Sequence, residues 1–289
     1  MVHKSKKYIF LFLTPAMLLI TVFLYYPLVR TIQYSFTDYS EWTPAFNYIG
    51  FENFKRLFTD SIIGKSLLNT LILLSGCVVV EIGGALILAI LVDSIKKGFK
   101  FFRTVYFFPV VISGSAIGLM FYQVFQYDYG LMNNLLEAFG MEKINWITEK
   151  SAMYLVLIPI LWQYVGFYFV IFLTAIANIP ADIYESAGID GISGFKRIIY
   201  ITVPMLQEII ITALGLVIAG SLKVFDIVFV MTNGGPLDAS QLLSTYQYQQ
   251  TFVYNNQGYG SAISVLIITL GLIIYLFTTK FGQRKEELY

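Results

Sequence analysis

The chain has 289 residues, of which 57% are hydrophobic and only 13% are charged, and its mean hydropathy is +0.70. Soluble globular domains are less apolar than this, so we expect an all-α integral membrane protein. A formal net charge of +1 indicates no nucleic-acid partner, and a single cysteine excludes an internal disulfide. The single histidine leaves almost no material for a metal site or for histidine-based catalysis.

Six apolar runs are long enough to cross the hydrocarbon core of a bilayer, which is about 30 Å thick, as α-helices. The first run follows Lys4, Lys6 and Lys7; it is too long for a signal peptide, and no small-residue cleavage site follows it. We expect one transmembrane domain over residues 1–289, with spans at about 8–29, 67–92, 104–125, 152–177, 203–231 and 261–281.

Ionisable residues occur inside two of these spans. Glu81 lies in the second span beside two glycines, and Lys223 and Asp226 lie in the fifth. Charged groups within spans face the bundle interior or a wet cavity. For Glu81 we favour a hydrogen bond to a neighbouring helix, and contact with a substrate or gate is the alternative. Lys223 and Asp226 are three residues apart, so they form either an internal ion pair or part of a substrate path.

The polar segment over residues 178–203, here called the elbow, separates the fourth and fifth spans. Pro180 is suited to the first turn of a helix, and Glu185 places negative charge near that end. Gly191 is a natural stop, and Ser193 is suited to cap a second short helix. The segment therefore predicts a helix-turn-helix that a membrane protein presents to water.

Basic residues predict the orientation, because loops on the cytoplasmic side carry more lysine and arginine. The termini and the even-numbered loops carry twelve: Lys4, Lys6, Lys7, Lys96, Lys97, Lys100, Arg103, Lys196, Arg197, Lys280, Arg284 and Lys285. The opposite side carries six: Arg30, Lys55, Arg56, Lys65, Lys143 and Lys150. Both termini and the elbow are therefore expected in the cytoplasm.

The elbow resembles the EAA loop of binding-protein-dependent ABC importer permeases. That pattern reads Glu-Ala-Ala, a glycine after three more residues, and Ile-x-Leu-Pro after another nine. This chain has Glu185-Ser186-Ala187, Gly191 and Ile201-x-Val203-Pro204, with the spacing intact and two small substitutions. The TNGGP turn at 232–236 and the Gly258-Tyr259 pair resemble the sugar-uptake branch, the maltose/multiple-sugar type permeases.

The resemblance implies a six-helix type I ABC importer permease fold with a cytoplasmic coupling helix, in a bacterial plasma membrane. It further implies a second, homologous permease subunit, two cytoplasmic ABC ATPase subunits and an extracytoplasmic sugar-binding protein as partners. ATP and magnesium would be bound by the ATPase, so this chain would hold no cofactor and would be a transport subunit rather than an enzyme.

The resemblance also implies two groups of site residues. Residues that contact the ATPase are expected in the elbow, namely Glu185, Ser186, Ala187, Gly188, Asp190, Gly191 and Phe195. On the substrate path, Gln163, Tyr164, Ser221 and Lys223 lie on or beside positions that contact sugar in maltose-type permeases, and Asp226 joins them through its spacing from Lys223. Trp162, Tyr168, Tyr122 and Gln123 are further mid-membrane candidates.

Two other function classes compete with the importer permease. An ion-coupled secondary transporter of a small polar solute is the main alternative, but such carriers tend to show two repeated halves with interrupted helices, and no repeat is evident here. A membrane-embedded enzyme is disfavoured by the scarcity of polar pairs. The sequence does not identify the sugar.

Overall fold

The computed structural model describes residues 6–42, 46–95 and 98–283, and within these ranges it is helical apart from loops and one isolated β-bridge between Thr37 and Tyr48. Five helices are long and apolar enough to cross a membrane, or six if one bent pair counts as a span. The expectation of an all-helical membrane chain is therefore confirmed. Among the residues used above, His3, Lys4, Lys96, Lys97, Arg284 and Lys285 lie outside the described ranges.

The chain divides into two compact units, and each is described by itself: unit 1 is residues 1–60 and 246–268, and unit 2 is residues 61–245 and 269–289. Unit 1 contains α1 (Lys6–Ile20), η1 (Thr21–Tyr25), α2 (Tyr26–Tyr34), α3 (Glu52–Thr59), η5 (Gln249–Val253) and parts of α15 (Leu243–Tyr248) and α16 (Gln257–Gln283). Its apolar candidate span, Phe10–Tyr34, buries none of its length within the chain, as a lipid-exposed helix would.

A carboxylate at the end of α3 holds unit 1 together. Asp60 Oδ2 accepts hydrogen bonds from the hydroxyls of Tyr246, at 2.7 Å, and Tyr259, at 2.8 Å, and the Arg56 guanidinium lies 4.0 Å from the centre of the Tyr259 ring. The residue before this tyrosine, Gly258, has no room for a side chain, because a Cβ there would lie 2.1 Å from the carbonyl oxygen of Thr37. The Gly-Tyr pair thus has a packing role at the start of α16.

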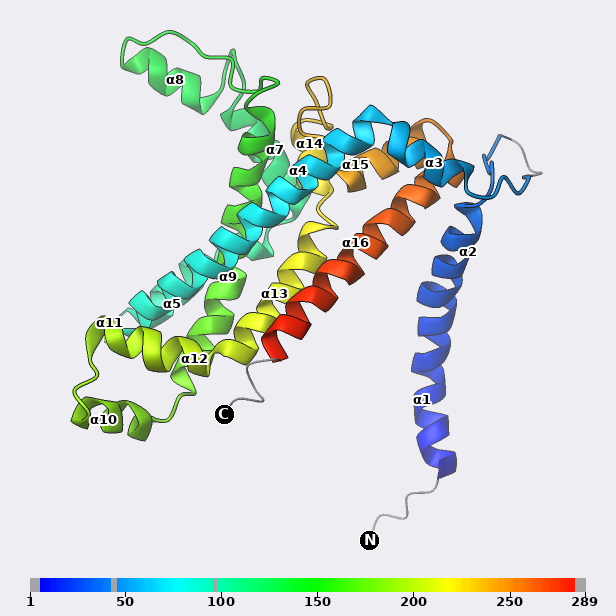
Figure 1. Ribbon diagram of the computed structural model, residues 1–289. Coiled ribbons are helices and arrows are strands. Elements are labelled where there is room, and N and C mark those ends of the chain that lie inside the picture. The colour runs from blue at the N-terminus through cyan, green and yellow to red at the C-terminus, as the bar shows by residue number, and fades with distance from the viewer. Residues whose placement is uncertain (1–5, 43–45, 96–97, 284–289) are drawn as a thin grey trace. The chain divides into compact units, whose positions relative to one another are not determined.

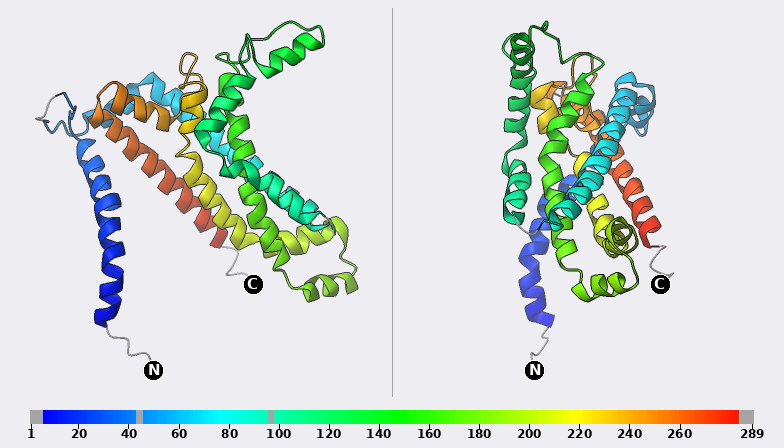
Figure 2. Two further views of the ribbon diagram at one scale, coloured as in Figure 1. Left: turned by 180° about the vertical axis from the view of Figure 1, so that it is seen from behind. Right: turned by 90° about the vertical axis from the view of Figure 1, so that its left-hand side faces the viewer.

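Unit 2 contains the remaining helices. They are α4 (Ser61–Cys77), η2 (Val78–Gly84), α5 (Ala85–Asp93), α6 (Phe99–Phe107), η3 (Phe108–Val111), α7 (Gly114–Val124), α8 (Leu131–Ala138), α9 (Ala152–Ala177), α10 (Ala181–Ile189), α11 (Gly194–Arg197), η4 (Ile198–Thr202), α12 (Val203–Met205), α13 (Gln207–Ser221) and α14 (Asp226–Met231). α5 packs along α9, and α14 packs along α7. Phe169 and Phe172 of α9 are fully buried in the core of this unit. Within this unit, α10 and α11 lie at one end and α8 at the other (Figures 1 and 2).

Two spans of unit 2 are interrupted. The segment expected to cross at 104–125 is bent by 94° between η3 and α7, and it is the bent pair that counts as a sixth span. Pro109 lies in the 3-10 turn η3, and Ser113 then caps α7 by accepting a hydrogen bond from the backbone N–H of Ala116 at 3.3 Å. The second break, at residues 222–225, separates α13 from α14. Both breaks border the site described next.

Candidate functional site

A pocket of about 280 Å³ lies in unit 2 between η2, α9 and the break that joins α13 to α14. It is lined by Cys77, Glu81, Ile160, Tyr164, Tyr168, Val217, Gly220, Ser221, Lys223, Val224, Asp226 and Ile227. Four of the five predicted substrate-path residues are therefore brought together: Tyr164, Ser221, Lys223 and Asp226. Tyr168 joins them from the wider candidate set, whereas Trp162, Tyr122 and Gln123 do not line this pocket.

The pocket has a buried end and an exposed end. Cys77, Glu81, Tyr168 and Ser221 are all buried, and Glu81 is only 4% exposed. Tyr164 is 40% exposed, and Lys223 and Asp226 are also exposed. No ion pair joins Lys223 to Asp226 or to Glu81 in the part of the chain that the structure describes, where the recorded pairs are Lys55–Glu52, Lys65–Glu149 and Lys143–Glu137. Glu81, Lys223 and Asp226 therefore line the pocket without forming ion pairs with one another.

The break in the helix is stabilised by hydrogen bonds from two serine side chains and from the backbone. The Ser244 hydroxyl donates to the carbonyl oxygen of Val224, and the Ser221 hydroxyl donates to that of Val217. The backbone N–H of Lys223 reaches Gly220 at 2.9 Å. Interrupted helices at membrane depth occur where they line a cavity, because unpaired backbone groups are costly in lipid. Ser221 retains its lone pairs for accepting a hydrogen bond from a solute.

Asp226 is fixed by close packing between α14 and α7. A Cβ on Gly114 would lie 1.9 Å from Asp226 Oδ2, and one on Gly118 would lie 3.1 Å from the carbonyl oxygen of Ile227. These two glycines, four residues apart, let the helices approach closely, as small residues do in membrane bundles. The Asp226 carboxylate consequently sits at the first residue of α7, where the helix dipole favours negative charge.

Gln163 is the predicted substrate-path residue that does not line the pocket. Its amide nitrogen donates to the carbonyl oxygen of Ile112 at 2.9 Å, which satisfies a backbone group left free by the bend before α7. Its Oε1 is buried and has no hydrogen-bond partner among the described residues. The structure thus gives Gln163 a role in holding the bend.

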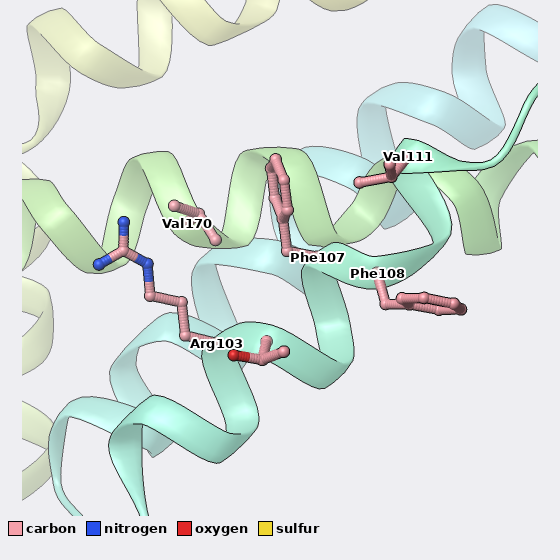
Figure 3. Close-up of a pocket in the computed structure, with 6 residues that line it drawn as sticks. Arg103, Phe107, Phe108, Val111 and Val170 are labelled. Atoms are coloured by element: carbon pink, nitrogen blue, oxygen red, sulfur yellow. The ribbon is translucent and has the colours of Figure 1, made fainter.

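A second hollow, also of about 280 Å³, lies on the outer side of α6, η3 and α9. Figure 3 shows Phe107 standing beside Val170 of α9, with Arg103 near one end of the hollow and Val111 near the other. It is lined mainly by apolar side chains and includes none of the predicted substrate-path residues, so the first pocket is the better candidate site.

The elbow contains α10, and the turn that ends this helix follows from its glycine. Gly191 has φ +74°, the backbone N–H of Ile192 bonds to the carbonyl of Ala187 at 2.8 Å, and that of Gly191 bonds to Gly188 at 3.2 Å. This is a Schellman arrangement, in which a left-handed residue closes the helix. The Tyr184 hydroxyl lies 3.3 Å from Thr202 Oγ1, and the Arg197 guanidinium lies 5.0 Å from the Tyr184 ring, so the two arms of the elbow contact each other.

Six of the seven predicted ATPase-contacting residues are exposed: Glu185, Ser186, Gly188, Asp190, Gly191 and Phe195. Ala187 differs, since it is buried at 5% exposure within the elbow's own packing. Ile189 is 88% exposed on the same helix, and the sequence reading did not single it out. Together with Phe195, at 74%, it gives the elbow an exposed apolar surface. The signal that could have identified Ile189 is its position as an apolar residue directly before the Asp190-Gly191 stop.

No group of three histidine, cysteine, aspartate or glutamate side chains suited to a metal ion occurs within residues 6–42, 46–95 and 98–283.

Comparison with known proteins gives consistent results along nearly the full length. Residues 82–287 match the family model described as "Binding-protein-dependent transport system inner membrane component". The chain is 33% identical to the probable ABC transporter permease protein YurN of Bacillus subtilis, covering 99% of this chain and 100% of the relative. It is 34% identical to the lactose transport system permease protein LacF of Rhizobium radiobacter, with 96% and 94% covered.

Further likenesses extend to a sugar system and to a solved structure. The multiple sugar-binding transport system permease protein MsmF of Streptococcus mutans is 32% identical, with 95% of each chain covered. A chain in the crystal structure of a bacterial ABC transporter that imports the acidic polysaccharide alginate superposes with a TM-score of 0.86 at 23% identity, covering 97% of this chain and 96% of that one. The latter likeness concerns the fold alone.

Proposed function

We propose that this chain, which belongs to the family of binding-protein-dependent transport system inner membrane components and is a permease subunit of an ABC importer, forms half of the translocation path for a sugar or oligosaccharide. The observation that carries the substrate class is the pocket at the break between α13 and α14. Lactose and multiple sugars appear in the names of full-length relatives, which supports the same class.

The chemistry of the pocket suits a hydroxyl-rich solute. Tyr164 and Tyr168 offer aromatic faces for sugar C–H surfaces and hydroxyls for hydrogen bonds, while the oxygen atoms of Ser221 and Glu81 can accept hydrogen bonds from sugar hydroxyls. Apolar residues such as Val217 and Ile227 complete the wall, as in most small-molecule sites. Because this chain supplies one side of the path, a second, homologous permease subunit is expected to supply the other.

The elbow is the part we assign to energy coupling. Its exposed Glu185 suits a charge-assisted contact with a basic partner, and exposed Ile189 and Phe195 suit an apolar groove. α9 ends just before the elbow and α13 begins just after it, so displacement of α10 by a closing ATPase dimer would move both helices together. Two cytoplasmic ATPase subunits, which would bind ATP and magnesium, are therefore the expected partners, and an extracytoplasmic binding protein would deliver the sugar. We accordingly expect the elbow and both termini to lie in the cytoplasm.

The proposal is tested by transport in vesicles. The complete complex, reconstituted with its binding protein outside, should take up labelled sugars from a panel of mono-, di- and trisaccharides only when ATP is enclosed. Ionophores that collapse proton and sodium gradients should leave uptake unchanged, because the energy comes from ATP. Uptake that persists without ATP and stops with the ionophores would favour the ion-coupled transporter instead.

A further inference from the structure

The second hollow, on the outer side of α6, η3 and α9, combines one cationic side chain with apolar walls. Its lining residues are Arg103, Thr104, Phe107, Phe108, Val111 and Val170. The first five of these are at positions i, i+1, i+4, i+5 and i+8, so they follow one side of α6 and η3. Figure 3 shows Arg103 near one end of the hollow and Val111 near the other. The hollow therefore runs along the span from a charged end to an apolar end.

The helices α6 and α9 pack closely beside the hollow. A Cβ on Gly166 would lie 1.7 Å from the carbonyl oxygen of Tyr106, so the approach of the two helices requires glycine there. Small residues of this kind are typical of the faces on which membrane helices pack together. The hollow instead presents bulky side chains, with Phe108 62% exposed and Val111 74% exposed. Such a face suits a flexible apolar ligand better than another helix.

The charged end of the hollow carries positive charge only. Arg103 is exposed and forms no ion pair within the described residues. Lys100, which is also exposed, precedes it by almost one turn of α6. The elements around the hollow, residues 99–111 and 152–177, contain no aspartate or glutamate. Because arginine stays protonated in proteins, this charge depends neither on burial nor on pH.

The cation lies where a span meets the membrane surface. α6 begins at Phe99, so Arg103 is about one turn into the helix, and its long side chain can extend to the polar headgroups. Val111 lies about 12–14 Å further along the span at the rise of α- and 3-10 helices. The excess of basic residues predicts that the Arg103 end is cytoplasmic, and anionic lipids of that leaflet attract basic residues beside spans.

We propose that this hollow is a binding site for an anionic phospholipid of the leaflet at the Arg103 end. The Arg103 guanidinium binds the phosphate group by charge-assisted hydrogen bonds, and Lys100 adds to the attraction. One acyl chain lies against Phe108, Val111 and Val170. None of these residues lines the solute pocket, so the inference goes beyond the proposed function and does not depend on which solute is carried.

A photoreactive side chain in the hollow identifies what occupies it. p-Benzoylphenylalanine is incorporated in place of Phe108, and the complete complex is reconstituted in vesicles with equal amounts of phosphatidylglycerol and phosphatidylcholine that carry the same acyl chains. After irradiation, mass spectrometry of the labelled peptide identifies each adduct. The ratio of phosphatidylglycerol to phosphatidylcholine adducts reports recognition of the headgroup, because the two lipids differ only there.

In the complex with an otherwise unaltered chain, this ratio should be about fivefold above that of the bulk bilayer, the effect of one basic residue on an anionic lipid at a membrane surface. Arg103→Gln should bring the ratio close to the bulk value, whereas Arg103→Lys should retain most of the enrichment. Lys150→Gln, which removes an exposed cation from the loop before α9, is the matched control and should leave the ratio unchanged.

Several results would overturn the inference. An adduct with another protein subunit would show that a subunit covers the hollow, and the absence of lipid adducts would show that no lipid enters it. A bulk ratio in the unaltered chain, or an enrichment that Arg103→Gln does not change, would show that lipids contact the hollow without being recognised by Arg103. The vesicle uptake assay decides the proposed function separately.

Discussion

Gly114 illustrates how a single residue fixes the candidate site. The Asp226 carboxylate packs against it so closely that a methyl group would overlap Oδ2. The sequence predicts that Asp226 lies inside the fifth span, and four of the residues expected on the substrate path do line the pocket. It does not indicate that a glycine in another span positions the Asp226 carboxylate, because that contact depends on how the two helices pack. Gln163 shows the same limit, because its partner is a backbone carbonyl 51 positions away that is free only owing to the bend.

We predict that Gly114→Ala destabilises the chain by about 1–3 kcal/mol, the usual cost of overpacking, because Asp226 or the whole of α14 must shift. Gly64→Ala is the control, since a Cβ at that helical position in α4 meets nothing within 4 Å. Thermal unfolding of the purified complex measures both. Equal midpoints for the two variants would show that Asp226 is not held by Gly114.

At the scale of elements, hydrophobic runs predict where helices occur, since burial in lipid requires about 20 apolar residues whatever the tertiary structure. Their ends are less predictable. α4 begins at Ser61, before the apolar run, because polar residues in its first turns have distant partners: Lys65 Nζ bonds to the carbonyl of Leu237 at 2.7 Å and Asn69 to that of Ala239 at 3.0 Å. The bend after Pro109 also depends on contacts across unit 2.

The two loops that flank α13 and α14 provide a test of orientation. In a Cys77→Ala background, Leu237→Cys, at a position 76% exposed in the second loop, should react in intact cells with a membrane-impermeant thiol reagent. Ser193→Cys, at an exposed position of the elbow, should react only after the cells are permeabilised, because the excess of lysine and arginine predicts that this side is cytoplasmic. The reverse pattern would move the elbow away from any ATPase.

At the scale of the whole molecule, we propose that the elbow passes motion from an ATPase to the pocket. The fold class and the family follow from the sequence because both rest on long apolar runs and on one motif with fixed spacing. The surface of the elbow that we expect to contact the ATPase was less evident from the sequence. Ala187 faces inward and Ile189 outward because the Schellman turn at Gly191 sets how α10 lies on the second arm of the elbow.

Stimulation of ATP hydrolysis by the sugar-loaded binding protein tests the central claim most directly, since it requires the path from pocket to ATPase to be intact. Gly191→Val forces a β-branched residue to φ +74°, a strain of about 1–2 kcal/mol, and distorts the turn that presents α10. Gly140→Val is the matched control, because Gly140 has φ +73° and closes α8 with the same hydrogen-bond pattern at the opposite end of unit 2. We predict that stimulation is lost in the Gly191 variant and retained in the Gly140 variant. Normal stimulation with Gly191→Val would contradict the account.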